Sequence, residues 1–174
     1  MARDGPRAAT HRAVAAEAGV PLAATTYYFA SREDLVVQAL RQAVDEELAE
    51  LEARIADVGE PATPEEAADL LAALFEETLA RDELALLAKN ELYLAAARTP
   101  ALLSEARRWT DAYLDLLAPM LERMGAADPR AGAELVVAAL DGLLDMRLSE
   151  QRCGPEQLQA HLRRLLVALC APRD

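Results

Sequence analysis

The sequence predicts an all-α fold in which a small N-terminal helix-turn-helix head precedes a larger helical-bundle body. Leucine and alanine, both strong helix formers, together make up about 40 % of the 174 residues. Only 7 glycines and 4 % aromatic residues accompany them, and β-branched residues are sparse. This composition argues against a sandwich, a barrel or a Rossmann-like sheet.

Helix starts are recognisable because a capping residue stands directly before a proline, which fits the first helical position without losing a useful donor. Thr63-Pro64 is the clearest start, since Glu66 can complete a capping box. Similar starts occur at Thr99-Pro100, Asp128-Pro129, Gly154-Pro155 and, without proline, at 31–34. Together with the helical spacing of apolar residues, they predict helices over residues 32–58, 64–81, 83–98, 100–124, 129–150 and 155–170. Pro119 should bend the helix that contains it.

The first thirty residues read as two short helices around a glycine turn, which is the arrangement of a helix-turn-helix. Residues 10–18 and 22–29 are the predicted helices, and Gly19 suits the positive φ that closes the first one. Ala15, four residues before this glycine, is small enough to let the helices cross closely, and Val20 anchors the turn. Such a motif places its second helix in the major groove of DNA.

The second helix carries a surface suited to that groove. Small residues at its N-terminal end permit close approach, so that alanine and threonine methyls can meet a thymine methyl and hydroxyls can bond to base edges or phosphates. Two adjacent tyrosines follow, and they suit contacts with phosphates. The surface comprises Ala23, Ala24, Thr25, Thr26, Tyr27 and Tyr28. Plain packing is the alternative explanation for two short helices, but the complete pattern favours DNA binding.

The segment AAEAGVPLAATTYYFASREDLVVQAL resembles the DNA-binding signature of TetR-type transcriptional regulators. The shared features are an Ala-Gly-Val turn, a tyrosine-rich recognition helix that closes on Phe29, and a Ser-Arg-Glu start to a long linking helix. The resemblance runs from about Thr10 to Leu40, roughly a fifth of the chain. Thr26 replaces the family's first tyrosine and Pro21 replaces its usual serine cap, so the base preference does not carry over.

The resemblance implies roles for individual residues of the head. Thr10 and Tyr28 would contact phosphates, whereas Tyr27 and Thr25 would enter the major groove. Arg32 would hold the DNA backbone at the start of the long helix. The residues expected at the DNA are Thr10, His11, Arg12, Pro21, Leu22, Ala23, Ala24, Thr25, Thr26, Tyr27, Tyr28 and Arg32. Most of the first of the family's three head helices is missing upstream of residue 10, and we expect this to be a truncation rather than a loss of DNA binding.

Net charge at first argues against a nucleic-acid partner, because the chain carries −12 at pH 7. The acidity is not evenly distributed, however. Residues 1–32 hold four arginines against Asp4 and Glu17, a net charge of +2, which leaves −14 for residues 33–174. A modestly basic head is compatible with contacts to phosphates, at an affinity that depends strongly on salt. Double-stranded operator DNA is therefore the expected partner.

Two domains are expected: residues 1–45, the head with the start of the linking helix, and residues 46–174, a ligand-binding and dimerisation domain. The last two helices are apolar enough to form a four-helix interface with a second copy, although they could instead simply cover the monomer core. The resemblance implies the homodimer. The expected interface residues are Val136, Ala139, Leu140, Leu143, Leu158, Leu162, Leu165, Leu166 and Leu169.

A small-molecule effector is expected to contact large or polar residues that stand on otherwise apolar stripes of the body. At helical spacing such residues are more often core filler, and the methionines above all. The best candidates are Phe75, Asn90, Tyr93, Trp109, Tyr113, Met120 and Met146, with Met124 beside them. Trp109 and Tyr113 lie one turn apart and share a helix face.

These observations predict a one-component transcriptional regulator in the cytoplasm, a repressor that a small apolar or amphipathic ligand releases from its operator. One alternative is a helical ligand-binding or protein-interaction module that no longer binds DNA. Another is a helical-bundle enzyme built on Asp141 and Asp145, which lie one turn apart. No histidine, cysteine or glycine-rich loop accompanies this pair, so we expect neither catalysis nor a cofactor or metal. No apolar run is long enough to cross a membrane, and the two cysteines are widely spaced.

Overall fold

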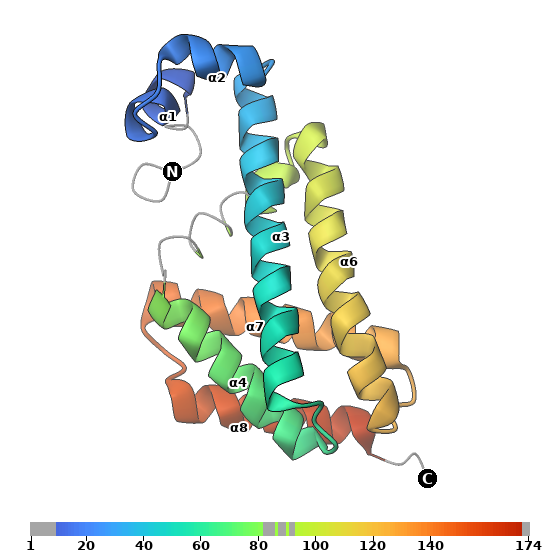
Figure 1. The fold of residues 1–174 in the computed structure, drawn as a ribbon. Helices are drawn as coiled ribbons and strands as arrows, with labels where there is room; N and C mark the ends of the chain where they lie inside the picture. The colour runs from blue at the N-terminus through green and yellow to red at the C-terminus, as the bar shows by residue number, and fades with distance from the viewer. Residues whose placement is uncertain (1–9, 82–85, 87–89, 91–92, 172–174) are drawn as a thin grey trace. The chain divides into compact units, whose positions relative to one another are not determined.

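A computed structural model of the chain describes residues 10–81, 86, 90 and 93–171 (Figure 1). Within these ranges every regular element is an α-helix, which confirms the predicted fold class. The helices are α1 (His11–Glu17), α2 (Leu22–Tyr28), α3 (Arg32–Val58), α4 (Pro64–Arg81), α6 (Pro100–Arg123), α7 (Pro129–Glu150) and α8 (Pro155–Cys170). Half of the predicted helix over residues 83–98 lies outside the described residues, and its described positions 86, 90 and 93–96 are helical. Helix α6 continues through Pro119.

Local capping bonds place the helix starts where the sequence predicts them. The Thr63 hydroxyl accepts a hydrogen bond from the backbone N–H of Glu66 at 3.2 Å, and the Glu66 carboxylate accepts one from the N–H of Ala62 at 2.8 Å. At the start of α7 the Asp128 carboxylate accepts from the N–H of Ala131 at 3.1 Å. These bonds satisfy donors that the first helical turn leaves without partners.

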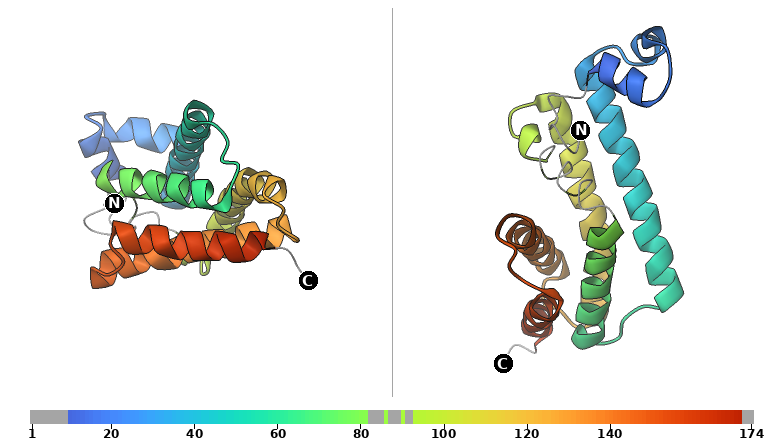
Figure 2. Two further views of the ribbon diagram at one scale, coloured as in Figure 1. Left: turned by 90° about the horizontal axis from the view of Figure 1, so that it is seen from below. Right: turned by 90° about the vertical axis from the view of Figure 1, so that its left-hand side faces the viewer.

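The chain forms two compact units. Unit 1 comprises residues 1–47 and 82–109, and unit 2 comprises residues 48–81 and 110–174. Helices α3 and α6 each contribute one part to either unit. In unit 2, helices α4, α7 and α8 pack together, with α8 in contact with both others (Figure 2).

The apolar core of unit 2 forms where α4, α8 and the C-terminal part of α6 meet α7. Its largest fully buried side chains are Val136, Leu121, Leu158, Leu162 and Leu166. Small residues of α4, Ala67 and Ala68, are completely buried among them. Burial of this apolar surface supplies most of the free energy that holds these helices together. In the part of the chain that the structure describes, no helix is long and apolar enough to cross a membrane.

Candidate nucleic-acid interface

The head is a helix-turn-helix with α1 and α2 packed against each other (Figure 1). Thr10 caps α1, because its hydroxyl accepts from the N–H of Ala13 at 3.2 Å. Ala15 is buried at 4 % exposure where the helices cross, and its carbonyl accepts from the N–H of Val20 at 3.0 Å. Gly19 adopts a φ of +64° between them. The turn thus has the geometry that the sequence predicts.

Thr25 does not lie on the exposed side of α2, where the sequence predicts it. Its side chain is only 5 % exposed, and its hydroxyl donates to the carbonyl of Leu22 at 2.9 Å and lies 3.4 Å from the carbonyl of His11. The side chain therefore faces α1, and the expectation that it enters the major groove is wrong. Its structural role is to hold the two helices together.

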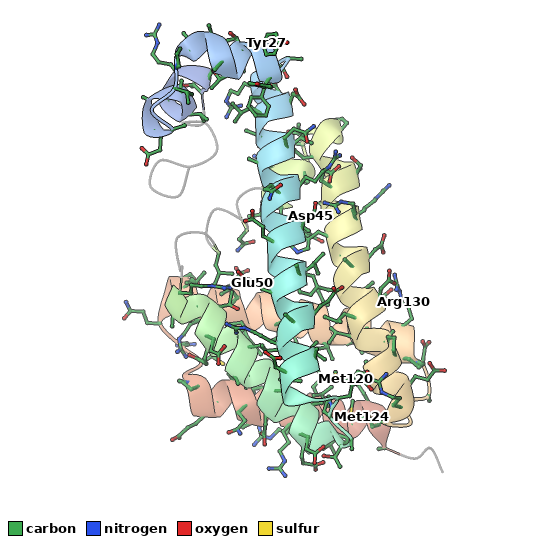
Figure 3. All side chains as sticks on the ribbon, viewed as in Figure 1. Tyr27, Asp45, Glu50, Met120, Met124 and Arg130 are labelled. Atoms are coloured by element: carbon green, nitrogen blue, oxygen red, sulfur yellow. The ribbon has the colours of Figure 1, made fainter. Side chains whose placement is uncertain are left out.

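The opposite face of α2 is exposed. Ala23, Thr26 and Tyr27 lie at helical spacing on it, and all three are open to solvent. Tyr27, which Figure 3 labels, is 84 % exposed. Tyr28 is 74 % exposed, and the two rings meet edge to face with centroids 5.1 Å apart. The Thr26 hydroxyl donates to carbonyls of its own helix. Tyr27 and Tyr28 are thus the large exposed side chains of α2 that carry a hydroxyl group.

The junction between α2 and α3 is fixed by two short-range hydrogen bonds. The Ser31 hydroxyl accepts from the N–H of Asp34 at 3.0 Å, and the Asp34 carboxylate accepts from the N–H of Ala30 at 2.9 Å. Leu35 and Val36 are buried directly after this junction.

The other expected DNA contacts stay predictions: Thr10, Arg12, Pro21, Leu22 and Ala23 are exposed, and His11, Ala24 and Arg32 are half-buried.

A chain of four alternating charges joins the first half of α3 to the first half of α6. Glu105 is 6 % exposed, and both oxygens of its carboxylate accept from the Arg41 guanidinium, at 3.2 and 2.5 Å. Arg108 donates to Glu105 at 3.1 Å and to Asp45 at 2.8 Å. The hydrogen bonds from Arg41, with those from Arg108, hold the pKa of Glu105 below its usual value although burial acts to raise it. Sequence reasoning missed this network, although the spacing of Glu105 and Arg108 was a local sign of it.

The candidate effector residues fall into both units. In unit 1 the rings of Tyr93 and Trp109 meet edge to face, with centroids 6.4 Å apart, and Trp109 is 3 % exposed. Asn90 is half-buried in the same unit. The candidates in unit 2 range from core to surface: Met120 is buried, Phe75, Tyr113 and Met124 are half-buried, and Met146 is exposed. The structure thus brings Tyr93 and Trp109 into ring contact.

Part of the expected dimer interface is instead the core of unit 2. Val136, Leu158, Leu162 and Leu166 are at most 1 % exposed within a single chain, so they cannot also face a partner. This part of the prediction is wrong because α7 and α8 are apolar on more than one side. Ala139, Leu140, Leu143, Leu165 and Leu169 stay candidates for the interface. The large apolar side chains exposed on these helices include Leu135, Met146 and Val167.

The carboxylates considered for an enzyme, Asp141 and Asp145, both lie on α7, toward its solvent-accessible side. Among the described residues no group of three or more His, Cys, Asp or Glu side chains is placed to hold a metal ion.

Comparison with known proteins gives one family and several similar structures. A family model described as "Tetracyclin repressor-like, C-terminal domain" matches residues 62–172. The multidrug binding protein EbrR, solved with ethidium, is 37 % identical, with 94 % of this chain and 90 % of that chain covered and a TM-score of 0.74. A TetR-family member from Streptomyces coelicolor A3 is 36 % identical over 95 % of this chain and 90 % of its own, with a TM-score of 0.75. A transcriptional regulator from Rhodococcus sp. Rha1 is 27 % identical, with 97 % of this chain and 88 % of that chain covered and a TM-score of 0.77. No curated protein matches the sequence.

Proposed function

Because the chain belongs to the TetR family of transcriptional regulators, we propose that it binds a palindromic operator as a homodimer and represses transcription until a small ligand releases it. In this proposal residues 1–45 bind DNA, and residues 46–174 bind the ligand and the partner subunit. The ligand favours a conformation in which α3 swings, so that the two recognition helices are no longer about one DNA turn apart.

The observation that carries DNA binding is the two-sided character of α2. One side of α2 packs against α1 through the buried Thr25, whereas the other side exposes Ala23, Thr26 and Tyr27 to solvent. Two adjacent, exposed tyrosines form a surface suited to a binding partner, since tyrosine combines a large apolar ring with a polar hydroxyl. Two exposed phenol groups beside small residues match the needs of a groove contact flanked by phosphate contacts.

The experiment selects duplexes from a randomised library with the wild-type protein and measures their affinity at moderate salt by fluorescence anisotropy. The proposal requires clear preference for selected duplexes over unselected ones. Tyr27→Phe removes one hydroxyl per subunit. Because a hydrogen bond to a charged group is worth about 1.5 to 3 kcal/mol, its loss should weaken binding by at least about tenfold. Thr78→Val, which also removes one hydroxyl, lies on α4 in unit 2 and is the matched control; it should leave the affinity unchanged.

Arg32 gives a second and independent measure of the same interface. If Arg32 neutralises one phosphate in each subunit, Arg32→Gln lowers the slope of log affinity against log salt by roughly 2. A wild-type protein that prefers no selected duplex over random DNA refutes the repressor and leaves a helical module that binds ligands or proteins.

For the ligand we propose a small amphipathic molecule with a planar aromatic part. Two aromatic rings, Tyr93 and Trp109, already meet in unit 1, and Trp109 is the only tryptophan of the chain. An edge-to-face pair of this kind can stack against a further ring. EbrR, which is similar over most of this chain, is a multidrug binding protein that has been solved with proflavin and with ethidium. A ligand of this chemical class is therefore the natural first probe.

Titration with ethidium tests the proposed ligand site directly, because ethidium bound beside Trp109 quenches the fluorescence of this tryptophan. Tyr93→Ala should weaken ethidium binding, whereas Leu94→Ala, at a neighbouring position that is 67 % exposed, should not. Bound ethidium should also lower the affinity for selected DNA. If ethidium binds without affecting DNA binding, the induction mechanism is refuted although the ligand site stands.

For the homodimer we propose the outer surface of α7 and α8. Leu135, Gly142 and Met146 lie on one exposed face of α7, and Val167 is exposed on α8. A Cβ added to Gly142 would meet nothing within 4 Å in one chain, so this glycine leaves room for close approach of a second backbone. Two helices from each subunit then form a four-helix interface around a twofold axis.

A further inference from the structure

Glu105 is the one charged side chain that is buried among the described residues. Burial of a carboxylate carries a large free-energy cost unless hydrogen bonds and opposite charges compensate for it. Here both are present: Arg41 binds it with a two-point fork, and Arg108 adds a third hydrogen bond. A fork of this kind fixes orientation as well as distance, because two parallel bonds define the plane of both groups.

The network lies close to the head along the chain. Arg41 and Asp45 are one turn apart on α3, and Glu105 and Arg108 are one turn apart on α6, so each helix contributes one positive and one negative charge. Figure 3 shows Asp45 on the side of α3 nearest α6. All four residues belong to unit 1, as do α1 and α2. The chain passes from α2 into α3 through the short junction at residues 29–31, so the direction of α3 determines where the recognition helix points.

We propose that Glu105 is a positioning residue for DNA binding: through its fork with Arg41 it fixes the head-bearing half of α3 to α6. This inference rests on the proposed DNA binding. Glu105 lies one turn before Trp109 on α6, so the helix segment that carries the candidate effector residue is the one that holds α3 in place. A displacement of this segment is passed to the head because the fork is directional and its carboxylate is buried.

The change in net charge and the change in hydrogen bonding predict opposite effects of Glu105→Gln on the affinity for DNA. The substitution removes one negative charge per subunit, so electrostatics alone would tighten DNA binding. The amide introduced at this position has a single acceptor oxygen and can accept only one arm of the Arg41 fork, so positioning predicts weaker binding, by about tenfold. The direction of the change therefore separates the two explanations.

The experiment measures the affinity of Glu105→Gln, Arg41→Met and the double variant for duplexes that the wild-type protein selects from a random library. Asp115→Asn is the matched control, because it removes one carboxylate charge from the same helix, where Asp115 pairs with Arg130 on the surface of unit 2. The control should bind within about twofold of wild type, as expected for an exposed ion pair. Circular dichroism melting verifies that each variant is folded at the assay temperature.

Arg41→Lys keeps a positive charge beside Glu105 but cannot form the two-point fork, so it tests the same contact in a folded protein if Glu105→Gln or Arg41→Met does not fold. If Glu105 acts through Arg41, each single variant lowers the affinity for the selected duplexes, and the double variant lowers it no further than the single variants do. Wild-type affinity in folded Glu105→Gln or Arg41→Met, or strictly additive effects, overturns the positioning role. Absence of any sequence preference in the wild-type protein overturns the proposed DNA binding itself, and with it this inference.

Discussion

Replacing Gly19 with alanine should destabilise the head by about 1 to 2 kcal/mol. Gly19 has a φ of +64°, and in this left-handed region the Cβ of an L-residue crowds the following carbonyl at about that cost. A Cβ built on Gly19 meets nothing within 4 Å, so no steric clash adds to the conformational penalty. Converted to an equilibrium constant, the change should increase local opening of α1 and α2 by about 5- to 30-fold.

Native-state hydrogen exchange measures this opening directly, since the amides of a locally unfolding segment exchange through it. The N–H of Val20, which donates to the carbonyl of Ala15, is the nearest reporter. Gly19→Asn is the matched variant, because asparagine tolerates the left-handed region better than alanine, and it should lose much less protection. The reasoning is refuted if the alanine variant exchanges as slowly as wild type, or if the asparagine variant is equally damaged.

Three further results are expected. Leu135→Glu, on the exposed face of α7, should dissociate the dimer in analytical ultracentrifugation. Leu94→Glu, at an exposed position in unit 1, is the control and should leave the dimer intact. If both variants have the same oligomeric state, this face of α7 is not the interface. Val136→Ala, fully buried one position away, should lower the free energy of unfolding in urea by about 2 kcal/mol, and an unchanged midpoint would contradict its core position. The lowered pKa of Glu105 stabilises the fold above the ordinary glutamate pKa, near 4.5, and this contribution is lost as the pH falls below that value toward the folded-state pKa. Wild type should therefore lose more stability than Glu105→Gln on acidification below about pH 4.5, and parallel pH profiles would argue against the lowered pKa.

The sequence by itself determined the helices, because the signals that begin and end them are local. Thr63 and Asp128 cap their helices through bonds that reach only three residues along the chain, and Gly19 closes α1 through its own backbone conformation. The predicted bounds of α3, α4, α7 and α8 accordingly agree with the structure. The helix-turn-helix was recognisable for the same reason, since its turn and its crossing residue lie within a few positions of each other.

Only the tertiary structure decided which side of each helix is covered. Leu135 and Val136 are equally apolar neighbours, yet one is 53 % exposed and the other fully buried, because α8 packs against one side of α7. Thr25 faces α1 rather than solvent for a similar reason, since α1 crosses α2 on that side. Glu105 finds its partner Arg41 64 residues earlier in the sequence. Periodicity shows that a helix has an apolar or polar side, but the neighbour that meets this side is set by packing between segments far apart in the chain.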